Sequence, residues 1–183
     1  MMNELSLHIL DIVQNSVAAR AKHIEIDVLE DKEKDRLEIR VKDDGAGMTP
    51  ELLKNVTDPF VTTRTTRKVG LGIPLLKFAA ESTGGSFSIE SEVGKGTVID
   101  AVFTLSHIDR APLGNMAETM ESLVVTNPEI EFTYKRQVGE KRFMLSTEEM
   151  KTVLGGLPIS SPEVLMWVKD TVNENEKELN GGA

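Results

Sequence analysis

The sequence contains no cysteine and no apolar stretch that approaches the ~20 residues needed to span a bilayer. Without cysteine, disulfide bonds and thiolate metal sites are excluded, although this absence alone does not fix the compartment. The segment from Met1 to Asp11 also lacks the basic leader and apolar core of a secretory signal. We therefore expect a cytoplasmic protein that does not associate with a membrane.

Basic residues are the minority among the charges: 21 Lys and Arg face 30 Asp and Glu, which gives a formal net charge of −9. A surface that binds DNA or RNA normally carries a basic excess. The one dense basic cluster in the sequence is Arg64, Arg67 and Lys68. It suits a single polyphosphate better than a nucleic-acid backbone, so we expect no nucleic-acid partner.

A regular order of predicted elements runs through residues 1–106, which we expect to form the first domain. Apolar residues at helical spacing predict a helix over 3–21, and alternating apolar residues predict strands over 23–28 and 37–43. The elements predicted to follow are a helix that starts at Thr49, a helix over 73–83, and strands over 86–93 and 97–105. This order predicts an α+β fold, a two-layer α/β sandwich with a mostly antiparallel mixed sheet.

After Leu105 the composition changes. We expect residues 107–114 to be a linker and residues 115–183 to form a small α+β C-terminal extension. The elements predicted there are helices over 115–125, 146–154 and 162–179, and a hairpin that pairs 131–135 with 141–145.

The apolar residues around Trp167 allow two interpretations. Leu165, Met166 and Val168 flank it within the last predicted helix. They either pack into the core, which is the more common outcome, or form a surface stripe that binds a partner. The acidity of this C-terminal region argues only against nucleic acid.

Asp11 and Asn15 form the first candidate site. They are four residues apart in the first predicted helix, so they share one flank of it, beside its apolar face. An amide oxygen is a hard, neutral ligand that suits Mg²⁺, and a carboxylate one turn earlier can accept a hydroxyl proton beside that metal. Taken alone, however, the pair is better explained as the polar edge of an amphipathic helix.

The second candidate site is Asp43-Asp44-Gly45-Ala46-Gly47-Met48, at the end of a predicted strand. Asp43 is expected to point into the layer between sheet and helices, where a buried carboxylate needs hydrogen-bond donors. The exocyclic amine of adenine is such a donor, whereas guanine presents an acceptor oxygen at that place. Gly45 and Gly47 let the backbone turn and approach a ligand closely. A simple glycine turn explains the segment equally well when it is taken alone.

The third candidate site joins a loop to the start of a helix. Gly70-Leu71-Gly72 exposes backbone amides at that start, where an anion can bind. The preceding loop, residues 57–69, could fold over a triphosphate as a lid, with Phe60 as its hydrophobic anchor. Its candidate contacts are Thr62, Thr63 and Arg64. An ordinary surface loop would explain the basic residues but not the paired glycines.

Gly94-Lys95-Gly96-Thr97 is the fourth pattern. It superficially resembles a phosphate-binding P-loop, but Ile89 stands where the first P-loop glycine belongs, and Gly96 interrupts the required order of Lys and Ser or Thr. A hairpin turn explains this segment better. Such a turn leaves Thr97 free to reach adenine from the neighbouring strand.

In this order and spacing, the four patterns together resemble the GHKL superfamily of gyrase, the ninety-kilodalton heat-shock chaperone, histidine kinases and the mismatch-repair ATPase. The resemblance covers residues 1–105. The family's N box is similar to residues 11–16, its two glycine boxes to 43–47 and 70–73, and its phenylalanine box to 58–60. The resemblance implies a Bergerat-type, histidine-kinase-like ATP-binding domain.

The resemblance also implies roles for the matching residues. Asn15 would coordinate Mg²⁺, and Asp43 would bind adenine through N6. The other implied ATP contacts are Met48 and Ile73 beside the base, Gly45 and Gly47 in the first glycine box, Gly70, Leu71 and Gly72 at the phosphates, and Thr97 at adenine through water. Asp11 stands where ATP-hydrolysing members carry a general-base Glu, and its shorter side chain argues against efficient hydrolysis.

Two functions stay open from the sequence. The first is a stand-alone kinase that phosphorylates Ser, Thr or His of a protein partner in trans, because none of the His residues in this chain has the setting of a phospho-acceptor. The alternative is an ATP-gated interaction module or slow ATPase whose lid loop controls partner binding. An inactive scaffold without affinity for ATP is the least favoured interpretation.

Overall fold

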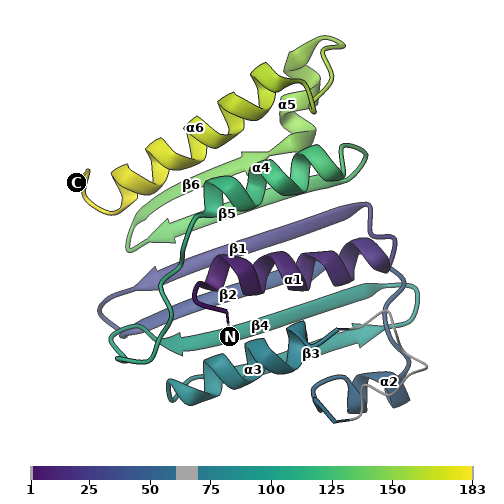
Figure 1. The fold of residues 1–183 in the computed structure, drawn as a ribbon, viewed down its shortest axis with the longest axis vertical. Helices are drawn as coiled ribbons and strands as arrows, with labels where there is room; N and C mark the ends of the chain where they lie inside the picture. Colours follow the sequence, from purple (N-terminus) through teal and green to yellow (C-terminus); the bar gives the residue numbers. More distant parts are fainter. Residues whose placement is uncertain (1, 61–69, 183) are drawn as a thin grey trace.

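The computed structural model describes residues 2–60 and 70–182. Figure 1 shows the arrangement of its helices and strands. In order, these are α1 (Leu5–Ala18), β1 (His23–Asp31), β2 (Arg36–Asp43), α2 (Pro50–Asn55), α3 (Gly72–Ser82), β3 (Ser86–Glu92), β4 (Gly96–Thr104), α4 (Met116–Thr126), β5 (Glu131–Val138), β6 (Lys141–Ser146), α5 (Thr147–Leu154) and α6 (Pro162–Leu179). The bounds predicted from the sequence lie within a few residues of these.

The strands form a six-stranded sheet in the order β3-β4-β2-β1-β5-β6. Neighbouring strands are antiparallel, except that β1 and β5 are parallel. Figure 1 shows α1, α3, α4 and α6 on the same face of this sheet. The predicted α+β fold, a two-layer sandwich with a mostly antiparallel mixed sheet, is therefore confirmed.

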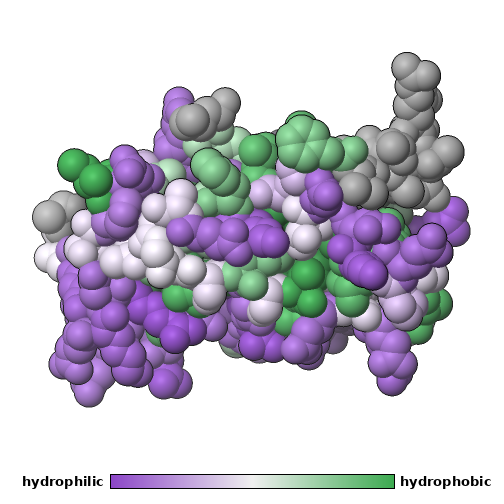
Figure 2. Space-filling model, turned by 90° about the horizontal axis from the view of Figure 1, so that it is seen from below, coloured by the Kyte–Doolittle hydropathy of each residue, from purple (hydrophilic) through white to green (hydrophobic). Residues whose placement is uncertain are grey.

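The core lies between the sheet and this helical layer. Ile24, Ile26 and Val28 of β1 are buried, and Glu25 and Asp27 alternate with them, so they face the other side of the sheet. The helix α1 meets the sheet through the buried residues Leu5, Ile9, Ile12 and Val13. Figure 2, a view from below in the orientation of Figure 1, shows a surface on which hydrophilic and hydrophobic residues are interspersed, as is usual outside a core.

The end of α1 differs from the prediction of a helix to residue 21. The helix ends at Ala18 because Arg20 adopts a left-handed conformation, with φ of 60°. The carbonyl of Ala19 then accepts a hydrogen bond of 2.9 Å from the backbone N–H of Ala46. The early end of α1 thus fixes the loop that follows β2.

Side-chain caps define the starts of several other helices. The Thr49 hydroxyl accepts from the Leu52 N–H at 3.2 Å, and Pro50 occupies the first turn of α2, as the sequence predicted. Asn115 and Ser146 cap α4 and α5 in the same way. Within the part of the chain that the structure describes, no helix is both long and apolar enough to cross a membrane.

The C-terminal residues continue the same sheet. Strands β5 and β6 pair as the predicted antiparallel hairpin, which is confirmed. Strand β5 also pairs with β1 in parallel, with His23 opposite Glu131 and Glu30 opposite Val138. A continuous cluster of buried apolar side chains contains residues from α1, β1, β5, α4 and α6.

A buried ion-pair network fastens α6 to β5 and β1. The guanidinium of Arg136, whose side chain is 2% exposed, contacts Glu30 at 3.0 Å and Glu176 at 3.2 Å. The Tyr134 hydroxyl donates to the other oxygen of Glu176 at 2.6 Å. Burial, together with the charge and hydrogen bond of Glu176, raises the pKa of Tyr134 well above its usual value. This hydroxyl therefore stays protonated and keeps donating.

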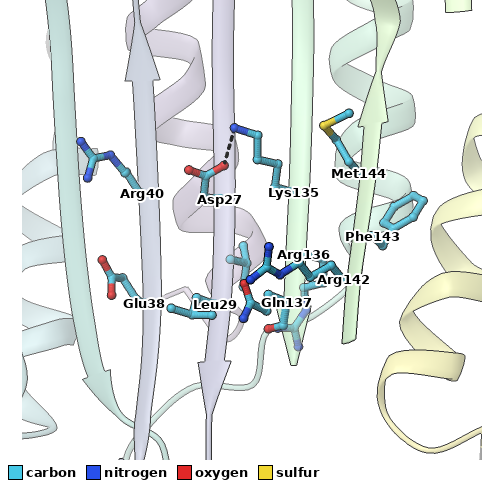
Figure 3. Close-up of a pocket in the computed structure, with 11 residues that line it drawn as sticks. Asp27, Leu29, Glu38, Arg40, Lys135, Arg136, Gln137, Arg142, Phe143 and Met144 are labelled. Atoms are coloured by element: carbon cyan, nitrogen blue, oxygen red, sulfur yellow. Dashed lines mark hydrogen bonds and ion pairs between the residues drawn. The ribbon is translucent and has the colours of Figure 1, made fainter. Parts of the chain in front are cut away.

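The face of the sheet opposite the helices carries charges that alternate in sign from strand to strand. Asp100, Arg40, Asp27 and Lys135 lie opposite one another on β4, β2, β1 and β5. Figure 3 shows Asp27 and Lys135 pointing toward each other; their charged atoms are 3.9 Å apart. Burial raises the pKa of Asp27, and the charge of Lys135 opposes this rise. A hollow of about 620 Å³ on this face is lined by apolar side chains and by charged ones, and Asp27, Glu38, Arg40, Lys135 and Arg136 among the latter form ion pairs within the protein.

We predict that Arg136→Met lowers the free energy of unfolding by about 3–5 kcal/mol, because it leaves the largely buried carboxylates of Glu30 and Glu176, which are 15% and 19% exposed, without their cation. Lys135→Ala on the same strand is the matched control. It breaks a partly exposed pair with Glu25 and should cost less than about 1 kcal/mol. Urea denaturation of both variants measures the difference, and equal losses would contradict a stabilising role for the buried network.

Candidate functional site

A cavity of about 390 Å³ opens between the C-terminal half of α1, the ends of β2 and β4, and the start of α3. Its walls combine apolar side chains with a few polar groups, as small-molecule sites do. The predicted site residues that line it are Asn15, Asp43, Gly47, Met48, Ile73 and Thr97. These residues come from four separate segments of the sequence, which the fold brings together.

Asp43 is fixed at the floor of this cavity by two donors. It is the last residue of β2 and is 9% exposed. The Ser16 hydroxyl of α1 donates to Oδ2 at 2.6 Å, and the Gly45 N–H donates to Oδ1 at 2.9 Å. A carboxylate can accept about four hydrogen bonds. Asp43 is therefore held in one orientation and can still accept from a ligand.

Thr97 lies beside Asp43 because the two residues are opposite each other in the β2–β4 ladder. Its hydroxyl is 2.8 Å from that of Ser91 in β3. The Ser91 hydroxyl also accepts from the Met48 N–H at 2.9 Å and donates to the Gly96 carbonyl at 3.0 Å. Ser91 thus ties the loop after β2 to the two strands under the cavity.

Glycine is required at two places in the loops around the cavity. Gly47 has φ of +69°, and a Cβ there would lie 2.0 Å from the Glu92 carbonyl oxygen. Gly96 has φ of +107°, and a Cβ there would lie 2.0 Å from the Asp43 carbonyl oxygen. The loop after β2 therefore packs directly, backbone to backbone, against the turn between β3 and β4. That turn confirms the hairpin predicted for Gly94-Lys95-Gly96-Thr97.

Asp11 lies beside the start of α3. A Cβ at Gly72 would be 3.2 Å from the Asp11 Cβ and 3.6 Å from its Oδ2. One turn further along α1, Asn15 lines the cavity. Asp11 and Asn15 therefore place a carboxylate and an amide between the cavity and the N-terminus of α3, where backbone amides can receive an anion.

The predicted site residues Gly45, Gly70 and Leu71 do not line the cavity. Gly45 lies against Ala19: a Cβ added at Gly45 would be 2.9 Å from the Ala19 Cβ. Gly45 supports the loop but does not line the cavity. A Cβ at Gly70 would meet no atom of the described residues within 4 Å, and Leu71, at the start of α3, is 52% exposed. The predicted contacts Thr62, Thr63 and Arg64 lie outside the described residues.

Phe60 does not have the predicted role of an anchor. Its side chain is 91% exposed, and its backbone N–H donates to Asp58 at 2.8 Å. A hydrophobic anchor requires an apolar socket, and a side chain this exposed fills none.

Asn15 is the residue for which the sequence predicted a metal-binding role. Its side-chain nitrogen is buried, and it has no hydrogen-bond partner within residues 2–60 and 70–182. The nitrogen of this amide is thus a buried donor without a partner among these residues, and the oxygen of the same amide is the atom that could bind a cation. Mg²⁺ keeps several waters and takes few protein ligands, so one amide oxygen suits it. Over the same residues, no group of three or more His, Asp or Glu could form another metal site.

Sequence comparisons link the part of the chain that carries the cavity to known proteins. The family model “Histidine kinase-, DNA gyrase B-, and HSP90-like ATPase” matches residues 3–108. Sporulation kinase C of Bacillus subtilis (strain 168) is 34% identical over 103 residues, 56% of this chain and 24% of that protein. Sporulation kinase E of the same organism is 35% identical over 97 residues, 52% of this chain and 13% of that protein. The chain thus spans a quarter or less of the length of these relatives.

A solved structure supports the fold over a larger part of the chain. “Crystal Structure of N terminal domain of a DNA repair protein” has a TM-score of 0.57 at 16% identity, covering 79% of this chain and 53% of that one. At this identity the likeness concerns the fold alone. This structural likeness covers more of the chain than the family match does, so it extends into the C-terminal residues.

Two glycines of one turn provide a matched test of the packing under the cavity. Gly94 and Gly96 both have positive φ, but only Gly96 touches the backbone of Asp43. Gly94→Ala should cost about 1–2 kcal/mol for its left-handed backbone. Gly96→Ala should cost about 1–3 kcal/mol more, because the Asp43 carbonyl must move. Thermal or urea unfolding measures both, and equal losses would contradict the close packing of β4 against the end of β2.

Proposed function

We propose that this chain, which belongs to the histidine kinase-, DNA gyrase B- and HSP90-like ATPase family, binds Mg-ATP in the cavity between α1 and the ends of β2 and β4. The membership confirms the family expected from the four sequence patterns. The observation that carries the proposal is the Asp43 carboxylate, which is nearly buried at the cavity floor and held there by Ser16 and Gly45.

In this proposal Asp43 accepts a hydrogen bond from the adenine N6 amine. Thr97, its neighbour on β4, contacts the base through a water molecule. Met48 and Ile73 supply the apolar surfaces beside the ring; both line the cavity, and Ile73 is 1% exposed. Guanine would turn a carbonyl oxygen toward the carboxylate, and two opposed acceptors in a buried site are unfavourable. The site should therefore select adenine.

The phosphates and the metal would lie toward α3. Asn15 would supply the protein ligand of Mg²⁺, and the amides from Gly70 to Gly72 would bind phosphate oxygens at the start of the helix. A Mg²⁺ ion held there would supply positive charge that stabilises phosphoryl transfer. From the sequence alone we also assign phosphate contacts to Thr62, Thr63 and Arg64.

We assign proton transfer to Asp11. Its carboxylate lies beside Gly72 at the N-terminus of α3, one turn from Asn15, and so adjoins the proposed phosphate site. There it can accept the proton of an attacking hydroxyl. The function we favour is a protein kinase that acts in trans on Ser, Thr or His of a partner in signalling or regulation, with the curated kinases as relatives of this domain.

The second candidate is an ATP-gated interaction module with slow or no hydrolysis, in which the loop of residues 57–69 controls partner binding. The observation in its favour is the side chain at position 11. Asp is one methylene shorter than the Glu that the family resemblance implies at this place in hydrolysing members, and it lies beside Gly72. If the Asp11 carboxylate does not reach the reacting oxygen, the protein would bind the nucleotide but turn it over slowly.

Asp43→Asn should weaken Mg-ATP binding about tenfold to hundredfold, because the replacement has one acceptor oxygen fewer toward the base. Isothermal titration calorimetry measures the affinity, and circular dichroism checks that the variant is folded. Asp170→Asn, an equal change on the exposed side of α6, is the control and should bind like the unchanged chain. Undiminished affinity in the Asp43 variant would refute the adenine contact.

Asp11→Asn should separate binding from chemistry. The replacement has the same size but cannot accept a proton, so transfer of labelled phosphate to a partner, or slow hydrolysis, should fall at least about a hundredfold. The Kd of Mg-ATP should change less than about threefold. If the unchanged chain neither labels a partner nor turns over, the interaction module is favoured. If the variant transfers phosphate as fast as the unchanged chain, Asp11 is not the base.

A further inference from the structure

A groove of about 560 Å³ lies at the far end of the sheet from the nucleotide cavity, between β6, α5 and α6. It is outside the part of the chain that matches the family. Figure 1 shows α5 and α6 beside β6, the last strand of the sheet. The residues that line the groove are Met144, Leu145, Ser146, Glu149, Met150, Val153, Leu154, Glu163, Val164 and Trp167.

Large apolar side chains of this groove are left in solvent. Val153 is 84% exposed, Trp167 is 52% exposed and Met144 is 50% exposed. The core side of α6 carries buried residues, among them Val168 and Val164, and Val164 also lines the groove. The apolar sequence around Trp167 is thus divided: Val168 is core, whereas Trp167 belongs to the surface.

The rim of the groove is acidic and is not neutralised by the protein. Glu149 and Glu163 line it, and neither forms an ion pair with any residue of the described ranges. Two neighbouring cations are already engaged: Lys151 pairs with Glu131 at 2.7 Å, and Lys169 pairs with Glu121 at 3.2 Å. Arg142, two residues before Met144 on β6, does not line the groove. Glu149 and Glu163 each lie in the first turn of a helix, where an acid is favourable. This preference does not explain the apolar side chains that are exposed between Glu149 and Glu163.

We propose that this groove is a docking site for a basic amphipathic helix of a partner protein. The apolar stripe of such a helix would cover Met144, Val153 and Trp167, and its flanking Lys or Arg residues would pair with Glu149 and Glu163. Two of the three walls of the groove are helices, so an added helix would pack in it helix against helix. The proposal does not depend on the nucleotide site.

The same acids disfavour two other occupants. A two-fold contact between two copies of the chain would place the acidic rim against itself, where like charges repel. An anionic membrane surface would be repelled in the same way. A basic protein segment is the occupant that both the charge and the apolar floor select.

Trp167 provides the readout because it is the only tryptophan of the chain. The probe is a synthetic, tryptophan-free helical peptide of Leu and Lys with Leu at helical spacing; a peptide with Glu in place of Lys is its control. We expect the Leu/Lys peptide to shift the Trp167 emission to shorter wavelength with saturation and to protect it from acrylamide. The Leu/Glu peptide should do neither.

Two pairs of variants test where the peptide binds. Val153→Ser should weaken binding at least about fivefold, whereas Ile108→Ser, at a residue that is 94% exposed elsewhere, should have no effect. A double variant with Glu149→Gln and Glu163→Gln should bind the Leu/Lys peptide about threefold to tenfold more weakly. Glu33→Gln with Glu51→Gln removes the same charge elsewhere and should leave the affinity unchanged. All of these side chains are exposed, so the variants should keep the fold.

Three outcomes would overturn the proposal. Equal effects of the groove variants and their controls would mean that the peptide is attracted only by the overall charge of −9. If the Leu/Glu peptide bound as tightly as the Leu/Lys peptide, the partner segment would not need to be basic. The Trp167 emission could also shift with protein concentration when no peptide is present. If sedimentation then showed a dimer, the groove would be assigned to a second copy of the chain.

Discussion

The hydrogen bond between Ser16 on α1 and Asp43 on β2 is the contact on which the proposed site depends. It joins the helical layer to the sheet at the place where α1 ends and the loop after β2 begins. Asp43 in turn orders the loop by accepting from Gly45, and the loop is closed from the other side by Ser91 and Gly96. A carboxylate without these donors would be too costly to bury. With them, it is rigid and still has acceptor capacity for a ligand.

Local sequence patterns predicted much of the fold because the elements of this chain obey their periodicities. Alternating Ile and Val in β1, the Thr49-Pro50 helix start and the glycine turn at 94–96 each carry their own signal. The parallel pairing of β1 with β5 has no such signal, because it joins residues about a hundred positions apart through contacts that only the tertiary structure sets. The left-handed Arg20 that ends α1 was missed because that conformation is usually adopted by glycine or asparagine, so an arginine gives no signal for it.

The candidate site was predictable to a similar degree. The spacing of the four patterns anticipated that Asn15, Asp43, Met48, Ile73 and Thr97 would meet, and they line one cavity. The parts played by Ser16 and Ser91 could not be predicted, because a serine hydroxyl bonds to whatever the fold places beside it. Phe60 was misjudged as an anchor because its apolar character says nothing about whether a socket exists for it. The roles assigned to the cavity residues remain proposals about chemistry that the geometry supports.

The most direct test of the account uses the unchanged chain and alters the ligand. Calorimetry should compare Mg-ATP with the Mg complex of purine riboside triphosphate, which lacks the exocyclic amine but is otherwise the same molecule. If the Asp43 carboxylate receives that amine, losing the donor should weaken binding about tenfold or more, since a buried acceptor is left without its partner. Equal affinity for the two nucleotides would contradict the account.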